Sequence, residues 1–249
     1  MKKGEKIYFA GDLHLGLPNY KKSRLREKKF VAWLDSIKDD AFEIYLLGDI
    51  FDFWFEYKRV VPRGFTRLLG KIAEIADSGV PVYFFTGNHD IWVFDYLPEE
   101  TGVIVQRKPL IKEIGGKIFF IAHGDGLGNG QFGFKLLKFI FHNKVLQWLF
   151  ARLHPNFALW MGGLWSAASR DAKGISIPFM GEDKEMMVRF AKETLKNEHF
   201  DYFVFGHRHL PIRIKLSDNC EYINLGDWIK TYSYAVFDGE KMEMFRYHK

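Results

Sequence analysis

The chain has 249 residues, of which 47% are hydrophobic and 17% aromatic, and it carries a formal net charge of +5. This length fits one large domain, or one domain with a sizeable insertion. A single cysteine, Cys220, excludes an intramolecular disulfide and indicates a reducing compartment. The first residues lack the apolar core of a secretory signal, and no stretch reaches the roughly 18 apolar residues of a spanning helix. We therefore expect a cytoplasmic protein, soluble or peripheral to a membrane, whose charge favours acidic partners such as phosphates.

Short apolar runs and amphipathic helices alternate along the first third of the chain. Runs typical of β-strands occur at about 6–11, 43–48, 81–86, 103–106, 117–122, 201–205, 212–216, 221–225 and 233–237. Apolar residues at helical spacing predict helices within 30–37, 65–76 and 187–195. The alternation, followed by a strand-rich C-terminal part, predicts a layered α/β domain. We expect one parallel sheet and a second sheet that is mixed or antiparallel.

Residues 127–180 interrupt this alternation. The segment is rich in aromatic and aliphatic side chains, and its charged residues are six basic and one acidic. Residues 131–153 have a helical pattern that is apolar around most of its circumference, which is unusual for a simple surface helix. We therefore predict a single domain spanning residues 1–249, with a greasy, basic helical insertion at 127–180.

Five of the strand-like runs end in side chains that bind metals. These side chains are Asp12, His14, Asp49, Asn88, His123, His207 and His209. In an α/β sheet, ligands collect at the carboxyl ends of the strands, so we expect the seven side chains to meet. Each alone has a simpler explanation, such as a helix cap for Asp49 or ordinary loop positions for His207 and His209. Five strand ends that carry such residues together favour a metal site.

The predicted ligands offer nitrogen and oxygen atoms but no sulfur. Such ligation suits Mn²⁺, Fe²⁺ or Zn²⁺ better than Ca²⁺ or Mg²⁺. Asp12 and His14 are two residues apart, so both would point to one side of an extended segment, and the two oxygens of Asp49 can bridge two ions. Two ions about 3.5–4 Å apart lower the pKa of a bound water and clamp phosphoryl oxygens. The pattern therefore predicts a two-metal hydrolase.

The order D-x-H, G-D-x-x-D, G-N-H-D, H-G-D, G-H-x-H over residues 10–209 resembles the calcineurin-like metallophosphoesterases. The resemblance implies a four-layer α/β/β/α sandwich. It implies that one metal is held by Asp12, His14, Asp49 and His209. It implies that the second is held by Asp49, Asn88, His123 and His207. His89, paired with Asp52, would be the general acid or the transition-state partner of the leaving oxygen, with a purely structural histidine as the alternative.

Further features resemble one branch, the UDP-2,3-diacylglucosamine pyrophosphatases of lipid A biosynthesis. They are GDIFDFWF at 48–55, the long insertion after HGDGLG, GHRHLP at 206–211 and YINLGDW at 222–228. These enzymes use Mn²⁺ to release UMP and the acylated sugar 1-phosphate, and their helical insertion caps the metal site and holds acyl chains. The resemblance implies a UDP-linked diacylated sugar lipid as substrate. It also implies peripheral attachment to the anionic cytoplasmic face of the inner membrane, and leaves the oligomeric state open.

The substrate contacts implied by this branch differ in one place. The best-known members read G-N-R-D, with the arginine on the substrate phosphates, where this chain has His89 in Gly87–Asp90. In SAASRDAK, Ser169, Arg170 and Lys173 resemble the motif of the cap that contacts the sugar and diphosphate, or they belong to a polar loop after a helix. The implied substrate-binding set is Asn88, His89, Ser169, Arg170, Lys173 and His207.

Two other functions compete with this interpretation. The same chemistry on another nucleotide, lipid or nucleic-acid substrate is the first. A nuclease would need basic residues and stacking aromatics along an exposed channel, whereas the aliphatic residues within 136–149 suit acyl chains better, so we expect no stable nucleic-acid partner. The second is a binding scaffold without activity, which would be expected to have lost ligands, yet every motif is intact.

Overall fold

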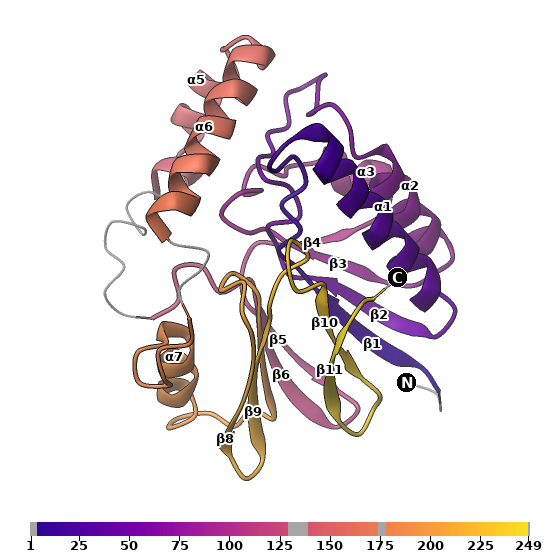
Figure 1. Ribbon diagram of the computed structural model, residues 1–249, viewed down its shortest axis with the longest axis vertical. Helices are drawn as coiled ribbons and strands as arrows, with labels where there is room; N and C mark the ends of the chain where they lie inside the picture. The colour runs from indigo at the N-terminus through magenta and orange to yellow at the C-terminus, as the bar shows by residue number, and fades with distance from the viewer. Residues whose placement is uncertain (1–3, 129–138, 174–177, 249) are drawn as a thin grey trace.

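The computed structural model describes residues 4–128, 139–173 and 178–248. Two β-sheets pack face to face, and helices cover both outer faces (Figure 1). The predicted four-layer α/β/β/α fold is therefore confirmed. Of the three buried clusters, one fills the space between the sheets and the others lie beneath the helices.

The first sheet has six strands in the order β11-β10-β1-β2-β3-β4. They are β1 (Lys6–Ala10), β2 (Ala41–Leu46), β3 (Val82–Phe85), β4 (Ile104–Gln106), β10 (Ser233–Phe237) and β11 (Met242–Arg246). β1 to β4 are parallel neighbours, but β10 pairs antiparallel with both β1 and β11. The prediction of one parallel sheet is thus wrong at this edge. β10 and β11 form a tight hairpin, which is antiparallel by construction, and β10 also pairs antiparallel with β1.

The second sheet is mixed and has the order β5-β6-β7-β9-β8. Its strands are β5 (Leu110–Ile114), β6 (Lys117–Ala122), β7 (Tyr202–Phe205), β8 (Pro211–Ser217) and β9 (Cys220–Leu225). β6, β7 and β9 are parallel, with an antiparallel strand at each edge. The sequence prediction missed β5 and β11, two edge strands in which charged residues interrupt the apolar run.

Four helices cover the two sheets: α1 (Tyr20–Ile37), α2 (Thr66–Asp77), α3 (Tyr96–Thr101) and α7 (Met186–Thr194). The first three lie on the first sheet and α7 lies on the second (Figure 1). The strands alternate between the two cores, so Tyr8 of β1 faces the helices while Ile7 and Phe9 face the other sheet. α1 begins well before the predicted helix, at a cap formed by Asn19. The apolar pattern missed its first turns because their buried side chains are polar, Arg26 and Glu27 among them.

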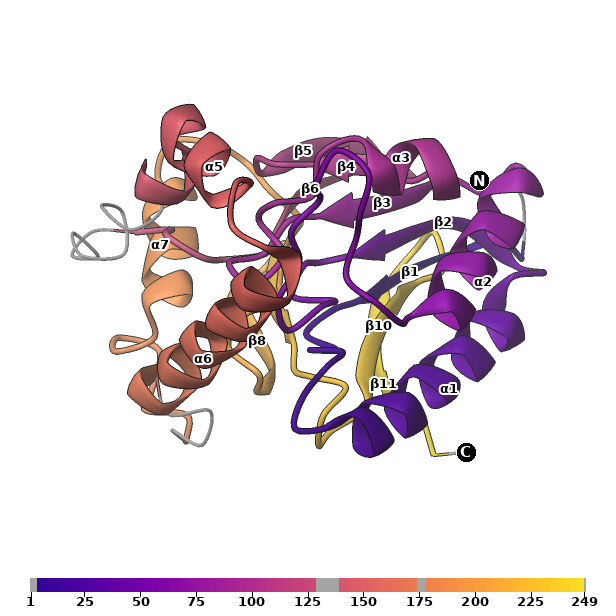
Figure 2. The same ribbon diagram turned by 90° about the horizontal axis from the view of Figure 1, so that it is seen from above.

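The predicted insertion contributes α5 (Lys144–Phe150) and α6 (Pro155–Lys173). Both lie at the end of the molecule toward which β1, β2 and β3 point (Figure 2). The helix predicted over 131–153 is interrupted at Asn143, whose side chain caps α5 by accepting the N–H groups of Val145 and Leu146. Residues 131–138 of that prediction lie outside the described residues. The division into one domain with an insertion at 127–180 stays a prediction.

Candidate metal centre

The seven predicted ligands follow the carboxyl ends of five strands. Asp12 and His14 follow β1, Asp49 follows β2, Asn88 follows β3, His123 follows β6, and His207 and His209 follow β7. Because these strands run parallel within each sheet and the sheets are stacked, their carboxyl ends meet at one edge of the sandwich. The parallel order of the central strands is what gathers residues from positions 12 to 209 into one place.

One cluster contains Asp12, His14, Asp49 and His209. Each offers one nitrogen or oxygen atom, and these four atoms lie within 4.8 Å of one another. The Nε2 atoms of His14 and His209 face each other at 3.2 Å. His209 Nε2 lies 3.2 Å from Asp12 Oδ1, and His14 Nε2 lies 3.6 Å from Asp49 Oδ2. This geometry fits one shared ion site.

A second cluster contains Asp49, His123 and His207. His123 Nε2 lies 3.4 Å from Asp49 Oδ2 and 3.2 Å from His207 Nδ1. Its other ring nitrogen, Nδ1, lies 2.7 Å from the carbonyl oxygen of Leu47, which accepts its proton and leaves Nε2 to face the cluster. Asp49 thus belongs to both clusters.

Two oxygens of the site are buried without a hydrogen bond: Oδ1 of Asn88, and Oδ1 of Asp12, whose contact with His209 is of ion-pair type only. Buried polar atoms are normally paired, and each one left unpaired is costly. These acceptor oxygens lie beside two pairs of imidazole nitrogens, and the two nitrogens of each pair are 3.2 Å apart. Oxygen and imidazole nitrogen atoms are ligands that divalent cations bind. The residues present therefore fit two metal ions.

Burial dominates the electrostatics of the cluster. It raises the pKa of Asp12 to about 7 and lowers the pKa of His14 to about 4. Burial acts against the charge of His123 too, but Asp49 raises its pKa to about 10. Burial likewise opposes the charge of Asp49, yet His123 and His89 hold its pKa well below the usual value. Since charges removed from water need compensation, cations would stabilise this site.

Five of the seven side chains project from left-handed backbone. The φ angles are 53° at Asp12, 44° at His14, 50° at Asp49, 65° at His207 and 55° at His209. Residues other than glycine rarely adopt such angles, which cost of order 1–3 kcal/mol each and cluster at functional sites. The extended conformation expected for Asp12-x-His14 is therefore wrong: sharp turns, rather than strand alternation, direct the side chains into the site.

His89 and Asp52 lie together beside His14, and the three offer ligand-type atoms within 4.8 Å of one another. His89 Nδ1 lies 2.9 Å from the backbone carbonyl oxygen of Asp52, whereas Oδ1 of Asp52 lies 3.2 Å from His14 Nδ1. The rings of His14 and His89 meet edge to face, with centroids 4.7 Å apart. Asp52 thus orients His89 through its backbone and His14 through its side chain.

The predicted cap residues Ser169, Arg170 and Lys173 lie in the last turns of α6, so their backbone is helical rather than a polar loop. Their side chains lie outside the described part of the structure. Ser166, one turn earlier and missed by the sequence prediction, is 2% exposed, and its Oγ lies 3.0 Å from His89 Nδ1. The only signal for it was that it begins the same SAASRDAK stretch.

Sequence reasoning also missed two buried carboxylates that hold the loops of the site. Asp90 accepts backbone N–H groups from both ligand loops, at Gly87 (2.7 Å) and Ile50 (2.8 Å), with longer contacts to Asp49 and Phe51. Asp227 accepts three successive N–H groups in the turn after β9, and its Oδ2 lies 3.7 Å from His209 Nδ1. Asp90 is the last residue of the G-N-H-D motif and Asp227 lies within YINLGDW, but the sequence did not show that both are buried.

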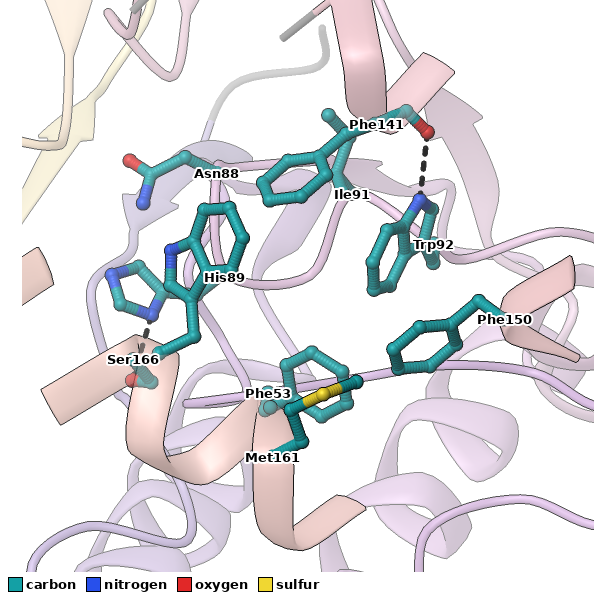
Figure 3. Close-up of a pocket in the computed structure, with 11 residues that line it drawn as sticks. Phe53, Asn88, His89, Ile91, Trp92, Phe141, Phe150, Met161 and Ser166 are labelled. Atoms are coloured by element: carbon teal, nitrogen blue, oxygen red, sulfur yellow. Dashed lines mark hydrogen bonds between the residues drawn. The ribbon is translucent and has the colours of Figure 1, made fainter. Parts of the chain in front are cut away.

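An apolar pocket adjoins the metal centre between the first sheet's loops and α6 (Figure 3). It encloses about 690 Å³, including its open mouth. Its apolar lining is Phe53, Ile91, Trp92, Phe141, Phe150, Met161, Gly162 and Trp165. Its polar end is formed by Asn88, His89 and Ser166. A hydrogen bond from Trp92 Nε1 to the Phe141 carbonyl (2.9 Å) ties the insertion to the core beside it.

Comparison with known proteins agrees with this site. The Calcineurin-like phosphoesterase family matches residues 5–211. A protein of Porphyromonas gingivalis named UDP-2,3-diacylglucosamine hydrolase is 39% identical over 94% of this chain and 94% of its own. A protein of the same name from Actinobacillus succinogenes is 28% identical over 92% of this chain and 94% of its own.

Among solved structures, the phosphoesterase Yfce from E. coli aligns over 97% of this chain and 92% of its own, with 14% identity and a TM-score of 0.46, a likeness too weak to argue from. The match over residues 5–211 and the 39% identity to a near full-length relative are far stronger. The chain therefore belongs to the calcineurin-like phosphoesterase family and is a metal-dependent hydrolase.

Proposed function

We propose that this protein hydrolyses the diphosphate of UDP-2,3-diacylglucosamine, releasing UMP and 2,3-diacylglucosamine 1-phosphate. Two relatives that align over nearly the whole chain carry the name of that hydrolase. The observation that carries the proposal is the pocket beside the metal centre, whose polar end is Asn88 and His89 and whose remaining lining is apolar. An amphiphile with phosphates on the metal side and an acyl chain among the aromatic rings matches this division.

The ligand sets follow the two clusters. We infer that Asp12, His14, Asp49 and His209 hold one ion. We infer that Asp49, Asn88, His123 and His207 hold the other. Mn²⁺ suits these nitrogen and oxygen donors, as do Fe²⁺ and Zn²⁺. Two bound ions would supply an activated water and neutralise charge on the phosphoryl oxygens.

The residues around the metals would bind and orient the substrate. The Asp52 carbonyl engages Nδ1 of His89, so Nε2 is the ring atom that remains for the leaving oxygen. Asn88 and His207 would contact the phosphates, and Ser169, Arg170 and Lys173 at the end of α6 would contact the sugar and diphosphate. The rings of Trp92, Phe141 and Phe150 would exclude water from the acyl side of the pocket.

We further propose that α5 and α6 bring the site to an anionic membrane surface, where the substrate resides. Their described residues expose large apolar side chains, among them Val145, Trp148, Leu149, Phe157, Trp160 and Leu164. Lys144 and Arg152 add positive charge, with the Arg152 guanidinium 4.5 Å above the Trp148 ring. Such a patch suits shallow insertion among acidic headgroups. No helix among the described residues is long and apolar enough to span the bilayer.

The decisive experiment follows UMP release from UDP-2,3-diacylglucosamine by the Mn²⁺-loaded protein. The soluble diester bis(4-nitrophenyl) phosphate serves as a parallel substrate. We expect turnover of the lipid by the native chain and background rates with Asp49→Ala, because that residue belongs to both ion clusters. Asp238→Ala, at an exposed turn, is the control that should keep full activity. Cleavage of the diester without release of UMP would refute the substrate, and activity of Asp49→Ala would refute the two-metal site.

A further inference from the structure

Ser166 is a point at which the described part of the helical insertion contacts a residue proposed for chemistry, His89. α6 turns a stripe of small residues, Ala158, Gly162 and Ser166, toward the core, and all three are buried. At Gly162, a Cβ atom would overlap the Phe53 ring, so the helix backbone approaches the core as closely as it can. This approach carries the Ser166 hydroxyl to 3.0 Å from His89 Nδ1, where Figure 3 shows it.

The contacts at His89 define what this hydroxyl does. A carbonyl oxygen can only accept, so the 2.9 Å contact with the Asp52 carbonyl places a proton on Nδ1. Ser166 Oγ is a second acceptor for the same N–H. It comes from α6, 77 residues further along the chain than His89. One acceptor alone leaves the ring able to pivot about its hydrogen bond, whereas two acceptors from different elements fix its plane.

We propose that Ser166 is a positioning residue for His89, holding the imidazole plane so that Nε2 faces the substrate. This inference rests on the role proposed above for His89. The His14 ring packs edge to face against His89, with centroids 4.7 Å apart, which limits rotation on that side. Ser166 limits it on the side of the insertion, so a helix outside the two sheets completes the orientation of a core residue.

The alternative role for a serine in this pocket is direct contact with the lipid substrate, and the two roles separate kinetically. A positioning residue acts on the chemical step of every substrate, so its loss lowers kcat for lipid and soluble diester alike. A residue that only binds the lipid raises KM for the lipid and leaves diester hydrolysis unchanged.

We therefore expect Ser166→Ala to lower kcat about 10- to 100-fold with both UDP-2,3-diacylglucosamine and bis(4-nitrophenyl) phosphate, with little change in KM. Ser166→Thr keeps the hydroxyl and should recover most of the rate. Gly163→Ala, on the same helix but with open space around the added methyl group, is the matched control and should match the native protein.

A double-mutant cycle completes the test. In a His89→Ala background, Ser166→Ala should cost nothing further, because the group that it positions is gone. Additive losses in the cycle, or a Ser166→Ala effect confined to KM for the lipid, would overturn the proposal. If the native protein releases no UMP, the proposed substrate fails, yet the Ser166 effect is still measured with the diester.

Discussion

At the scale of single residues, the positions of the ligand loops depend on buried hydrogen bonds as well as on the ligands themselves. Asp49, shared by both ion clusters, has its backbone N–H in contact with Asp90, and its Oδ1 accepts the N–H of His89. Arg26 donates to the carbonyl oxygens of His14 and Leu17 and so holds the first ligand loop. The ligand loops are therefore joined to one another by hydrogen bonds of buried side chains.

Asp90→Ala should lower the free energy of unfolding by about 3 kcal/mol or more, because it leaves several buried backbone N–H groups unpaired. Activity should fall together with stability, since Asp49 and Asn88 lie on the two loops that Asp90 joins. Urea denaturation and diester hydrolysis measure the two effects. Asp238→Ala removes a carboxylate that also accepts two backbone N–H groups, but at an exposed turn. Equal losses in the two variants would contradict the argument from burial.

Metal binding should stabilise the whole fold measurably, because the ions compensate buried charge. At a free Mn²⁺ concentration 100 times its Kd, each bound ion should add about 2.7 kcal/mol. Thermal melts after chelation and after return of Mn²⁺ check this. Asp49→Ala is the comparison, and its melting temperature should barely respond to Mn²⁺. An equal response of both proteins would indicate that the ions bind elsewhere.

At the scale of elements, α6 connects the pocket to the metal centre. Its small residues at 158, 162 and 166 are spaced four apart, which places them on one face of the helix. Its larger residues Phe157, Trp160 and Leu164 are exposed. One face of the helix therefore brings its backbone close to the core, and its other residues expose large apolar side chains to solvent.

Gly162→Ala should displace α6 from the core, because the added methyl group overlaps the Phe53 ring. We expect lipid hydrolysis to fall more than about tenfold, as misplacement by about 1 Å can cost 100-fold. Steady-state UMP release measures the effect, with Gly163→Ala as the neutral neighbour. Phe53→Leu combined with Gly162→Ala should recover part of the loss by opening space. Full activity of Gly162→Ala would show that α6 can shift without consequence.

Several of these elements could be predicted from the sequence, and others could not. The central strands and the seven ligand-type residues were visible because apolar runs ended in Asp, Asn or His. The first turns of α1 were not, since their buried face carries Arg26 and Glu27, and Glu27 accepts N–H groups at the start of α2. Asp90 and Ser166 were missed because their importance lies in tertiary contacts, which periodicity does not encode.

At the scale of the whole molecule, the site and the exposed apolar patch share one end of the sandwich. Figure 2 shows α5 and α6 beside the ends of β1, β2 and β3. The two sheets and their helices contribute a rigid frame, with three buried clusters between the layers. The insertion adds exposed apolar side chains at this end, Trp148, Trp160 and Leu164 among them.

Binding to vesicles should therefore depend on the insertion and on anionic lipid. We expect Trp148→Ala with Trp160→Ala to weaken sedimentation with phosphatidylglycerol vesicles at least about tenfold, and salt to weaken binding of the native protein. Ile111→Ala is a matched control, since Ile111 and Trp148 are each 55% exposed and Ile111 lies on β5. Diester hydrolysis should be unchanged in these variants. Equal binding by all of them would exclude the patch as the contact surface.

The left-handed backbone at five ligand-type residues has a consequence for how such a site persists over generations. Glycine would relax the backbone at any of these positions, so selection for stability alone favours replacing the side chains that the chemistry needs. Only continued demand for turnover opposes that drift. A descendant released from this demand should lose Asp12, His14, Asp49, His207 and His209 early, while its two sheets and their packing survive.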